Sequence, residues 1–280
     1  MESALTDRLA TLSHPQRMAV FRLLMRRCPD ELPAGEIAGA LDLKASTASV
    51  YLSALTQASL ISQRRDGTRL LYALNLDVTR EVVAGLFVDC CRGRADLCPP
   101  QFSDLLRSIS PMSDKKFNVL FVCTGNSARS IFAETILRDM VGDKFTAYSA
   151  GTAHRSELNP FAVEMLKSKG HDVALLRSKN IQEFQGADAP HMDFIFTVCD
   201  LAANEECPTW PGQPVSGHWG MPDPVKAEGT DAEKRLAFHQ TYGALHNRIM
   251  AFSALSFESL DRASLQKRID EIGKKTVKQE

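Results

Sequence analysis

The chain has 280 residues, 44% of them hydrophobic and 24% charged, with a formal net charge of −1. This is the composition of an ordinary globular protein that is long enough for two domains with a core each. The near-zero charge excludes nucleic-acid binding through overall charge, so any such affinity must come from a local patch. No apolar run approaches the roughly 20 residues that span a bilayer, and the start of the chain does not resemble a secretory signal. Seven cysteines without an export signal favour a cytoplasmic protein whose thiols are catalytic or metal-binding.

The first part of the chain shows helical periodicity, interrupted by two segments in which apolar and polar residues alternate. Hydrophobic periodicity predicts helices over residues 5–28, 34–42, 45–59 and 78–90. Asp42-Leu43-Lys44 supplies the turn of a helix-turn-helix pair. In residues 60–65 and 68–74, apolar and polar side chains alternate, and Asp66-Gly67 lies between the two segments. This pattern is a strong signal of a β-hairpin. We therefore predict an α+β winged helix-turn-helix domain over residues 1–98.

The helix over residues 45–59 is the candidate recognition helix, and the hairpin is the candidate wing. The helix and the residue before it offer side chains that can reach base edges or phosphates: Lys44, Ser46, Thr47, Ser49 and Tyr51. The wing tip offers phosphate or minor-groove contacts from Arg64, Arg65 and Arg69. Residues 1–100 hold 12 Lys/Arg against 11 Asp/Glu, so the alternative is a winged helix that binds proteins.

Two segments of this domain resemble the ArsR/SmtB family of metalloid-responsive repressors. They are Leu12-Ser13-His14-Pro15-Gln16-Arg17 and Ser46-Thr47-Ala48-Ser49-Val50-Tyr51-Leu52. The resemblance implies a homodimer that binds operator DNA and releases it when a metal or metalloid binds. Many arsenic sensors of that family carry a cysteine pair at the start of the helix before the recognition helix, where this chain reads Leu32-Pro33-Ala34-Gly35-Glu36.

Three cysteines lie at and after the end of the last predicted helix: Cys90, Cys91 and Cys98. Three thiolates suit the trigonal, soft coordination of trivalent arsenic. No histidine lies near them in sequence to complete a four-ligand zinc site, although a partner subunit could supply one. Some members of the resembled family have a similar arrangement, so we expect arsenite to bind here as the inducer. The alternative is three incidental cysteines, and Cys28 is expected to be structural.

A polar stretch with Pro99, Pro100 and Pro111 predicts a linker over residues 99–116. From residue 117 onward, strands alternate with helices. Strands are predicted from Phe117 and over residues 145–150 and 194–199, and helices over residues 127–140, 159–169 and 231–273. This order predicts a second domain over residues 117–280, with a parallel α/β sheet and helices on both faces.

The first of these strands leads into a loop with the spacing of an oxyanion site. Residues 119–130 read Val-Leu-Phe-Val-Cys-Thr-Gly-Asn-Ser-Ala-Arg-Ser. Backbone N–H groups at a helix N-terminus can face a tetrahedral anion, and the planar fork of Arg129 suits two oxygens of phosphate or arsenate. The amide dipoles and Arg129 should favour the thiolate of Cys123. We predict Cys123 as a nucleophile beneath the anion.

The Cys-x5-Arg-Ser loop resembles that of the low-molecular-weight tyrosine phosphatases. The longer string Cys-Thr-Gly-Asn-Ser-Ala-Arg-Ser, followed by Ala133-Glu134, is more similar to the arsenate reductases built on that fold. The resemblance implies an anion cradle made of Thr124, Gly125, Asn126, Ser127, Ala128, Arg129 and Ser130. It also implies that Asp223, in Asp223-Pro224, is a general acid. Asn126 and Glu134 match positions that support the loop or a potassium ion in some relatives.

Cys199 and Cys207 distinguish a reductase from a phosphatase, because dithiols supply the two electrons that reduction needs. The implied relay starts when Cys123 attacks arsenate. Cys199 then attacks Cys123 and releases arsenite, and Cys207 moves the disulfide to a place where an external reductant reaches it. Thioredoxin, glutaredoxin and a small thiol remain open as the donor. The alternative is a buried strand thiol at Cys199 and an incidental Cys207.

Together, these features predict an arsenite-responsive repressor fused to a thiol-dependent arsenate reductase. The product of the enzyme would be the ligand of the sensor. Two alternatives stay open: a low-molecular-weight phosphatase with a regulatory winged helix, and a pure regulator with an inactive enzyme domain.

Overall fold

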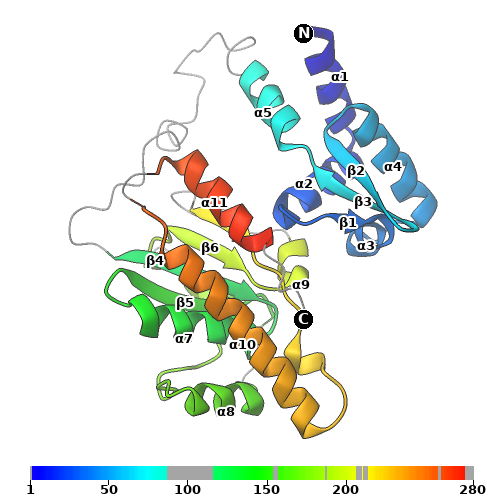
Figure 1. Ribbon diagram of the computed structural model, residues 1–280. Helices are drawn as coiled ribbons and strands as arrows, with labels where there is room; N and C mark the ends of the chain where they lie inside the picture. Colours follow the sequence, from blue (N-terminus) through cyan, green and yellow to red (C-terminus); the bar gives the residue numbers. More distant parts are fainter. Residues whose placement is uncertain are drawn as a thin grey trace. The chain divides into compact units, whose positions relative to one another are not determined.

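The computed structural model describes residues 2–86, 116–153, 157–186, 188–205, 210, 214–257 and 260–274. The chain forms two compact units, Met1–Phe102 and Ser103–Glu280, which Figure 1 shows in ribbon form. Residues 99–115 of the predicted linker lie outside the described residues, so the linker bounds stay a prediction. Within the described residues, no helix is both long and apolar enough to cross a membrane.

The N-terminal unit is a winged helix-turn-helix domain, as predicted. Its elements in chain order are α1 (Glu2–Leu12), α2 (Pro15–Arg27), β1 (Leu32–Pro33), α3 (Ala34–Ala40), α4 (Ala45–Gln57), β2 (Ile61–Asp66), β3 (Arg69–Leu74) and α5 (Leu76–Gly85). The wing hairpin turns at Gly67, whose φ of 58° lies in the left-handed region that favours glycine. The short strand β1, which was not predicted, pairs with β3 and completes a three-stranded sheet.

The single helix predicted over residues 5–28 is wrong, because the chain breaks into α1 and α2 at residues 13–14. Pro15 has no backbone N–H, so it cannot continue the hydrogen-bond ladder of α1, but it fits the first turn of α2. The ring of His14 caps α2 by accepting a hydrogen bond from the Gln16 amide at 3.2 Å. The apolar periodicity continues across the break, which explains why the pattern suggested one helix.

The N-terminal core forms where the apolar faces of α2, α3 and α4 meet. Leu23, Ile37, Leu52 and Leu55 are fully buried there, as their helical spacing predicts. Arg27 is also buried, and its guanidinium binds Asp30 at 3.3 Å and Glu36 at 2.9 Å. The buried charge is therefore paired, which joins the end of α2 to α3.

The C-terminal unit is built on a parallel sheet with the strand order β5-β4-β6-β7. Figure 1 labels β4, β5 and β6 of this sheet. Its elements are β4 (Phe117–Cys123), α7 (Arg129–Val141), β5 (Phe145–Gly151), α8 (Pro160–Ser168), η2 (Ile181–Phe184), β6 (Phe194–Thr197), α9 (Asp200–Asn204), β7 (Val215–His218), η3 (Pro224–Lys226), α10 (Asp231–Ser253) and α11 (Arg262–Lys274). The predicted α/β class with a parallel sheet is confirmed.

Helical elements cover both faces of this sheet, as predicted. Phe145 and Tyr148 lie three residues apart on β5, so they point to opposite faces. Phe145 packs on Phe252 of α10 with ring centroids 5.4 Å apart, and Tyr148 packs on Phe184 of η2 at 5.6 Å. The sheet is therefore buried on both sides, which agrees with the continuous apolar run of β4.

Three details of this unit differ from the prediction. The strand predicted over residues 194–199 ends at Thr197, and Cys199 instead caps α9, where a polar loop was expected. The edge strand β7 was missed because Val215-Ser216-Gly217-His218 has little apolar signal. The helical region predicted over residues 231–273 is present, but it is divided into two helices, α10 and α11, and this division was not predicted.

Candidate active site and candidate DNA-contacting helix

The chemistry-bearing residues of the C-terminal unit meet at one edge of its sheet. The carboxyl ends of parallel strands lie together, and ligands bind there in open α/β sheets. Cys123 ends β4, Cys199 follows the neighbouring strand β6, and Asp223 follows β7. The topology thus brings Cys123, Cys199 and Asp223 to the same edge of the sheet, although they are up to 100 positions apart in the sequence.

The loop after Cys123 is held with its carbonyl groups turned outward. The carbonyl oxygens of Cys123 and Thr124 accept hydrogen bonds from Thr152 and Ala153, each at 3.0 Å, and that of Ser127 accepts one from Asn159 at 2.9 Å. In a trans peptide, the N–H of the next residue points opposite to the carbonyl. The N–H groups of residues 124, 125 and 128 therefore point away from these partners, which is the arrangement that an anion cradle needs.

Cys123 is 3% exposed and receives two hydrogen-bonding partners from its own loop. The Asn126 amide donates to its Sγ at 3.1 Å, and the Ser130 hydroxyl lies 2.9 Å from the same sulfur. Asn126 has a φ of 43°, a left-handed conformation that asparagine tolerates better than most residues. This backbone turn directs the Asn126 amide at the Cys123 sulfur.

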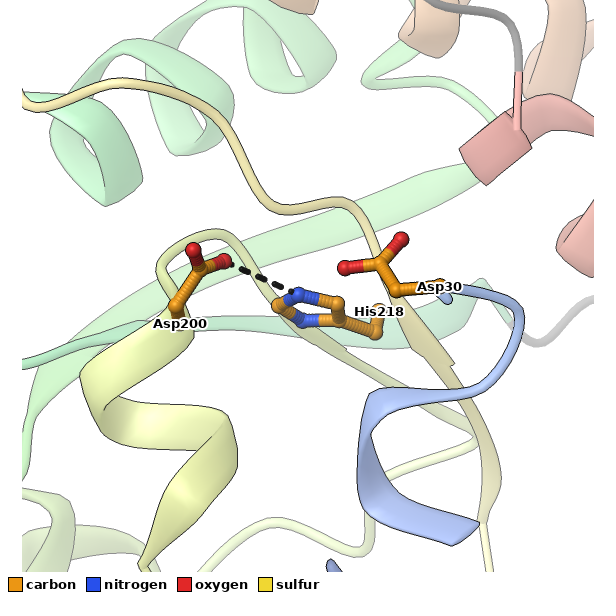
Figure 2. Close-up of side chains that lie close together, drawn as sticks. All are labelled: Asp30, Asp200 and His218. Carbon is orange, nitrogen blue, oxygen red and sulfur yellow. Dashed lines mark hydrogen bonds and ion pairs between the residues drawn. The ribbon is translucent and has the colours of Figure 1, made fainter. Parts of the chain in front are cut away.

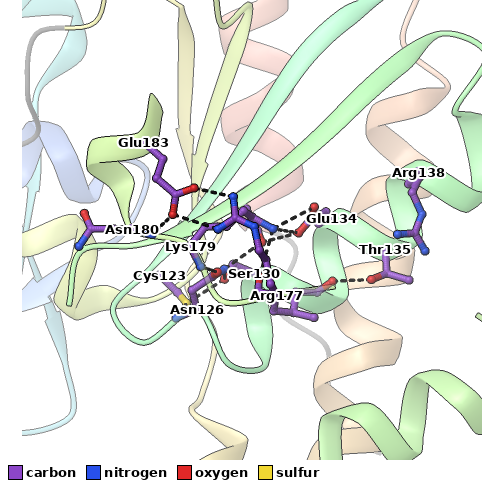
Figure 3. Close-up of polar contacts among 12 residues, drawn as sticks. Cys123, Asn126, Ser130, Glu134, Thr135, Arg138, Arg177, Lys179, Asn180 and Glu183 are labelled. Atoms are coloured by element: carbon purple, nitrogen blue, oxygen red, sulfur yellow. Dashed lines mark hydrogen bonds and ion pairs between the residues drawn. The ribbon is translucent and has the colours of Figure 1, made fainter. Parts of the chain in front are cut away.

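The Asn126 side chain is buried and fully hydrogen-bonded. Its Nδ2 donates to Ser130 Oγ at 2.9 Å and to Ser149 Oγ at 2.8 Å, and its Oδ1 accepts from the Lys179 amide at 2.7 Å. The Ser149 hydroxyl donates in turn to Glu134, whose carboxylate binds the Lys179 ammonium (Figure 3). A continuous polar network therefore extends from Cys123 to a buried ion pair.

Burial raises the pKa of the Cys123 thiol above its ordinary value. The Ser130 hydrogen bond lowers it, a charge on Cys199 would raise it, and Arg129 and the Asn126 amide lower it. The expected preference for thiolate is therefore wrong for this arrangement: Arg129 and the amide act in the predicted direction, but desolvation outweighs them. Arg129 is also paired with Asp223, which reduces the effect of its charge on the sulfur.

Arg129 and Asp223, both predicted as site residues, contact each other. The guanidinium lies 2.9 Å from the Asp223 carboxylate and donates to the Met221 carbonyl at 3.1 Å. Arg248 of α10 also binds the segment that contains Met221 and Asp223, because its guanidinium donates to the Trp219 carbonyl at 2.7 Å. Arg248 is buried and was not predicted, because nothing in a helical pattern marks an arginine that will bind a distant loop.

Cys199 is buried beside the loop of the first cysteine. Its Sγ lies 3.4 Å from the Thr124 hydroxyl and accepts a long hydrogen bond from the Ala202 amide at 3.5 Å. Cys199 thus lies next to the first residue after Cys123. Cys207 lies outside the described residues, so its place in the site stays a prediction.

His218, which sequence reasoning missed, binds the residues that flank Cys199. Its Nδ1 lies 2.8 Å from Thr197 Oγ1 and its Nε2 lies 3.2 Å from Asp200 Oδ1, the pair joined by the dashed line in Figure 2. A Cβ at Gly220 would lie 2.5 Å from both Asp200 Oδ1 and His218 Nε2. A side chain at position 220 would therefore push against the Asp200–His218 pair. Through His218, the segment containing Cys199 is joined to β7, the strand that leads to Asp223.

In the N-terminal domain, α4 and the wing expose most of the predicted DNA-contacting residues. Exposed positions are Lys44, Ser46, Ser49, Arg64, Arg65 and Arg69. Thr47 is half-buried, and Tyr51 packs on His14 with ring centroids 5.0 Å apart. Arg64 binds Glu31 at 2.9 Å. Val50, which was not predicted, is 65% exposed on α4, and an apolar side chain there can contact a thymine methyl group.

Cys90, Cys91 and Cys98, the predicted arsenite ligands, lie outside the described residues.

Comparison with known proteins agrees with the fold of the C-terminal unit. Residues 118–268 match the model of the low molecular weight phosphotyrosine protein phosphatase family. An arsenate reductase of Bacillus licheniformis is 37% identical over 139 residues, which cover 49% of this chain and 96% of that protein. An arsenate reductase of Halalkalibacterium halodurans is 38% identical over 135 residues, which cover 48% of this chain and 94% of that protein.

A solved structure similar to the N-terminal part is the homodimeric winged helix-turn-helix DNA-binding domain of a Mycobacterium bovis protein, described as a possible ArsR-family transcriptional regulator. It shares 26% identity over 33% of this chain and 82% of that chain, with a TM-score of 0.27. The winged-helix fold itself follows from α1–α5 and the wing hairpin described above. The chain thus belongs to the low molecular weight phosphotyrosine protein phosphatase family, within which its C-terminal domain is of the arsenate reductase type.

Proposed function

We propose that this protein reduces arsenate to arsenite in its C-terminal domain and that its N-terminal domain is an arsenite-responsive repressor. One observation carries the enzymatic part of the proposal. The Cys199 sulfur lies 3.4 Å from the hydroxyl of Thr124, the residue that follows the nucleophile. A hydrolase needs one cysteine in its anion loop, whereas a reductase needs a second thiol within reach of the first.

The first step binds arsenate in the loop and joins it to Cys123. The sulfur attacks arsenic(V) and forms an S–As bond, while the bond between arsenic and one hydroxyl breaks. The Asp223 carboxylate takes up the thiol proton and passes it to that hydroxyl, which leaves as water. Arg129 separates from Asp223 to bind two arsenate oxygens, and its fork suits that geometry. The outward carbonyls of the loop support this role, because they leave its N–H groups to stabilise the anion.

The second step is the reduction. Cys199 attacks the Cys123 sulfur, a Cys123–Cys199 disulfide forms, and the S–As electron pair stays on arsenic. The Cys199 thiol proton passes to an arsenic-bound oxygen, and arsenic(III) leaves as arsenite. Cys207 then attacks Cys199, so the disulfide moves to Cys199–Cys207 and Cys123 is released as a thiol. An external dithiol donor of the thioredoxin or glutaredoxin type, or a small thiol, finally reduces that disulfide.

Arsenate reduction by the full-length protein tests this proposal. Wild type and the Cys123→Ser, Cys199→Ser and Cys207→Ser variants are assayed with thioredoxin, glutaredoxin and a small thiol as separate donors. We expect Cys123→Ser to form no arsenite and the other two variants to stop after at most one turnover. Cys28→Ser is the matched control and should behave as the wild type does. Full multiple-turnover activity in Cys199→Ser would contradict the relay.

The second candidate is phosphatase activity at the same site. Cys123, Arg129 and Asp223 are the groups that phosphoryl transfer through a cysteine also needs: a nucleophile, an oxyanion-binding cation and a general acid. Arg129 and Asp223 contact each other, so both can reach one bound oxyanion. Turnover of an aryl phosphate that survives the loss of Cys199 and Cys207, without any arsenate reduction, would favour this alternative.

The repressor part of the proposal rests on α4 and the wing, which expose polar and basic side chains as a DNA-binding winged helix does. We propose that a homodimer binds operator DNA and that arsenite releases it through Cys90, Cys91 and Cys98. Cys90→Ser should abolish arsenite-induced release and leave operator binding unchanged, with Cys28→Ser as control. Persistent release in both Cys90→Ser and Cys91→Ser would contradict this sensor site.

A further inference from the structure

The C-terminal domain holds a buried ion pair that takes no direct part in the proposed chemistry. The Lys179 ammonium lies 2.9 Å and 3.2 Å from the two Glu134 carboxylate oxygens. It also donates to the Arg177 carbonyl at 3.3 Å. The side chains of Lys179 and Glu134 are only 9% and 13% exposed. Charges this far removed from water are unfavourable unless each has a close partner, so the two residues depend on each other.

The pair is connected to the nucleophile by side chains in direct contact. Glu134 accepts a hydrogen bond from Ser149, and Ser149 accepts one from Asn126 Nδ2 at 2.8 Å. The Asn126 amide then donates to Cys123 Sγ at 3.1 Å. Lys179 closes the network at its other end, because its own backbone amide donates to Asn126 Oδ1 at 2.7 Å (Figure 3).

The charge on Lys179 therefore determines how this network is oriented. With the ammonium on Glu134, the carboxylate accepts from Ser149, which leaves the Ser149 oxygen to accept from Asn126. Asn126 is thereby held with its oxygen toward Lys179 and its Nδ2 toward the serines, in the left-handed backbone conformation that turns its N–H toward sulfur. Without the Lys179 ammonium, the buried Glu134 carboxylate would lose the cation that it contacts directly, and the orientation of Asn126 would lose its support.

Glu134 is also where the sequence resemblance places a potassium ion. A monovalent metal would have to bind the same carboxylate oxygens that the Lys179 ammonium occupies. An ammonium group has the same charge as potassium and similar demands for oxygen partners, so the two are alternatives at this position rather than neighbours.

We propose that Lys179 is a positioning residue that supplies a built-in monovalent cation to the anion loop, in place of a bound potassium ion. This inference rests on the proposed function for its kinetic consequence but not for its binding consequence. Wild type should reduce arsenate equally well in sodium and potassium salts of equal ionic strength. A variant without the ammonium should acquire a dependence on potassium.

The test compares Lys179→Ala with Lys144→Ala, the same substitution at an exposed lysine. Arsenate reduction is measured in sodium chloride and in potassium chloride. In sodium, Lys179→Ala should raise the KM for arsenate by about tenfold or more, with a smaller change in kcat, because the cradle is displaced while the sulfur remains. Potassium should restore most of that loss, and Lys179→Arg should retain a KM near that of wild type. Lys144→Ala should match wild type in both salts.

A binding measurement separates this inference from the proposed activity. Sulfate protects Cys123 from iodoacetamide if the loop binds a tetrahedral anion, whether or not the protein reduces arsenate. Lys179→Ala should need about tenfold more sulfate for half-protection in sodium than in potassium. If wild type shows this protection but reduces no arsenate, the proposed function fails and the role of Lys179 stands.

A second variant covers the case in which Lys179→Ala does not fold. Lys179→Met combined with Glu134→Gln removes both charges, so no buried charge is left unpaired. We expect this variant to fold and to show weakened sulfate protection that potassium does not restore. Protection equal to wild type in this double variant, or in Lys179→Ala in sodium, would overturn the proposal.

Discussion

Arg129 in the C-terminal domain and Arg64 in the N-terminal domain both bind a carboxylate, but in opposite environments. The side chains of Arg129 and Asp223 are 11% and 26% exposed, whereas those of Arg64 and Glu31 are 56% and 38% exposed. Breaking a buried pair by removing one partner is expensive, whereas an exposed pair contributes about 0–1 kcal/mol. The candidate anion site therefore has charged groups that are held in place before a ligand arrives. The candidate DNA-contacting side chains of the wing are exposed to water.

The largest expected effect tests the buried side of this comparison. Cys123→Ser should lower arsenate reduction by at least about 10³-fold, because a serine hydroxyl neither attacks arsenic as readily nor forms the disulfide that releases arsenite. Far-ultraviolet circular dichroism should show an unchanged fold, and operator binding should be retained. Measurable multiple turnover in this variant would mean that the nucleophile lies elsewhere.

Arg129→Lys should reduce kcat/KM for arsenate by about 10²-fold. Arg129 reaches both Asp223 and the Met221 carbonyl with one planar fork, and a lysine ammonium cannot replace both contacts. Arg235→Lys is a matched control, since Arg235 forms an exposed pair with Glu164 at 3.1 Å. If the two substitutions have equal effects on steady-state kinetics, the fork of Arg129 is not needed.

Asn126→Ala should lower the free energy of unfolding by about 2–3 kcal/mol. The change places alanine in a left-handed backbone conformation that asparagine tolerates better. It also removes the side-chain hydrogen bonds to Ser130, Ser149 and the Lys179 amide. Asn159→Ala removes the side chain that caps α8, and should cost about 1 kcal/mol. Urea titration followed by fluorescence measures both. A smaller loss at Asn126 than at Asn159 would contradict the role assigned to the network.

Alkylation of Cys123 should show the raised pKa of its thiol. Because burial favours the neutral form, the alkylation rate should increase with pH and reach half its maximum above the pH at which a free cysteine does. The same shift contributes stability that is present below the unfolded-state pKa and lost as the pH rises through the folded-state value. Mass spectrometry of the Cys123 peptide after iodoacetamide gives the rate. A midpoint below that of free cysteine would contradict the effect of burial.

The smallest effect is expected on the exposed side. If the wing contacts phosphate, Arg65→Ala should reduce the slope of log affinity against log salt by about one. Arg64→Ala should change it less, because Glu31 already binds that guanidinium. Fluorescence anisotropy with operator DNA at several salt concentrations measures both slopes. Equal slopes for both variants and wild type would place the DNA contact away from the wing.

Local patterns predicted much of this fold. Asp66-Gly67 marked the wing turn, and the spacing of Leu52 and Leu55 marked the buried face of α4. The Cys-x5-Arg loop between an apolar run and a predicted helix placed Cys123 near the end of a strand and Arg129 in the first turn of a helix, where the structure has them. These features depend on nearest neighbours along the chain, so a sequence pattern contains most of the information about them. The break at Pro15 and the early end of β6 were missed, because apolar residues continue through both.

The contacts that join distant segments could not be predicted. Nothing near Arg248 indicates that it binds the Trp219 carbonyl, and nothing near His218 indicates that it binds the residues on either side of Cys199. The pKa of Cys123 was expected to be low from its neighbours in sequence. Packing of the sheet and helices around it removed water and raised that pKa.

By itself, the sequence determined the two-domain division into winged helix and parallel α/β sheet, the oxyanion loop, and the residue types available for thiol chemistry. Only the tertiary structure decided that Arg129 binds Asp223, that Cys199 lies beside Thr124, and that Lys179 occupies the carboxylate of Glu134. The reason is that turns, caps and amphipathic faces are set by residues a few positions apart. The protonation, pairing and burial of a charged group depend on whichever segments the fold brings against it.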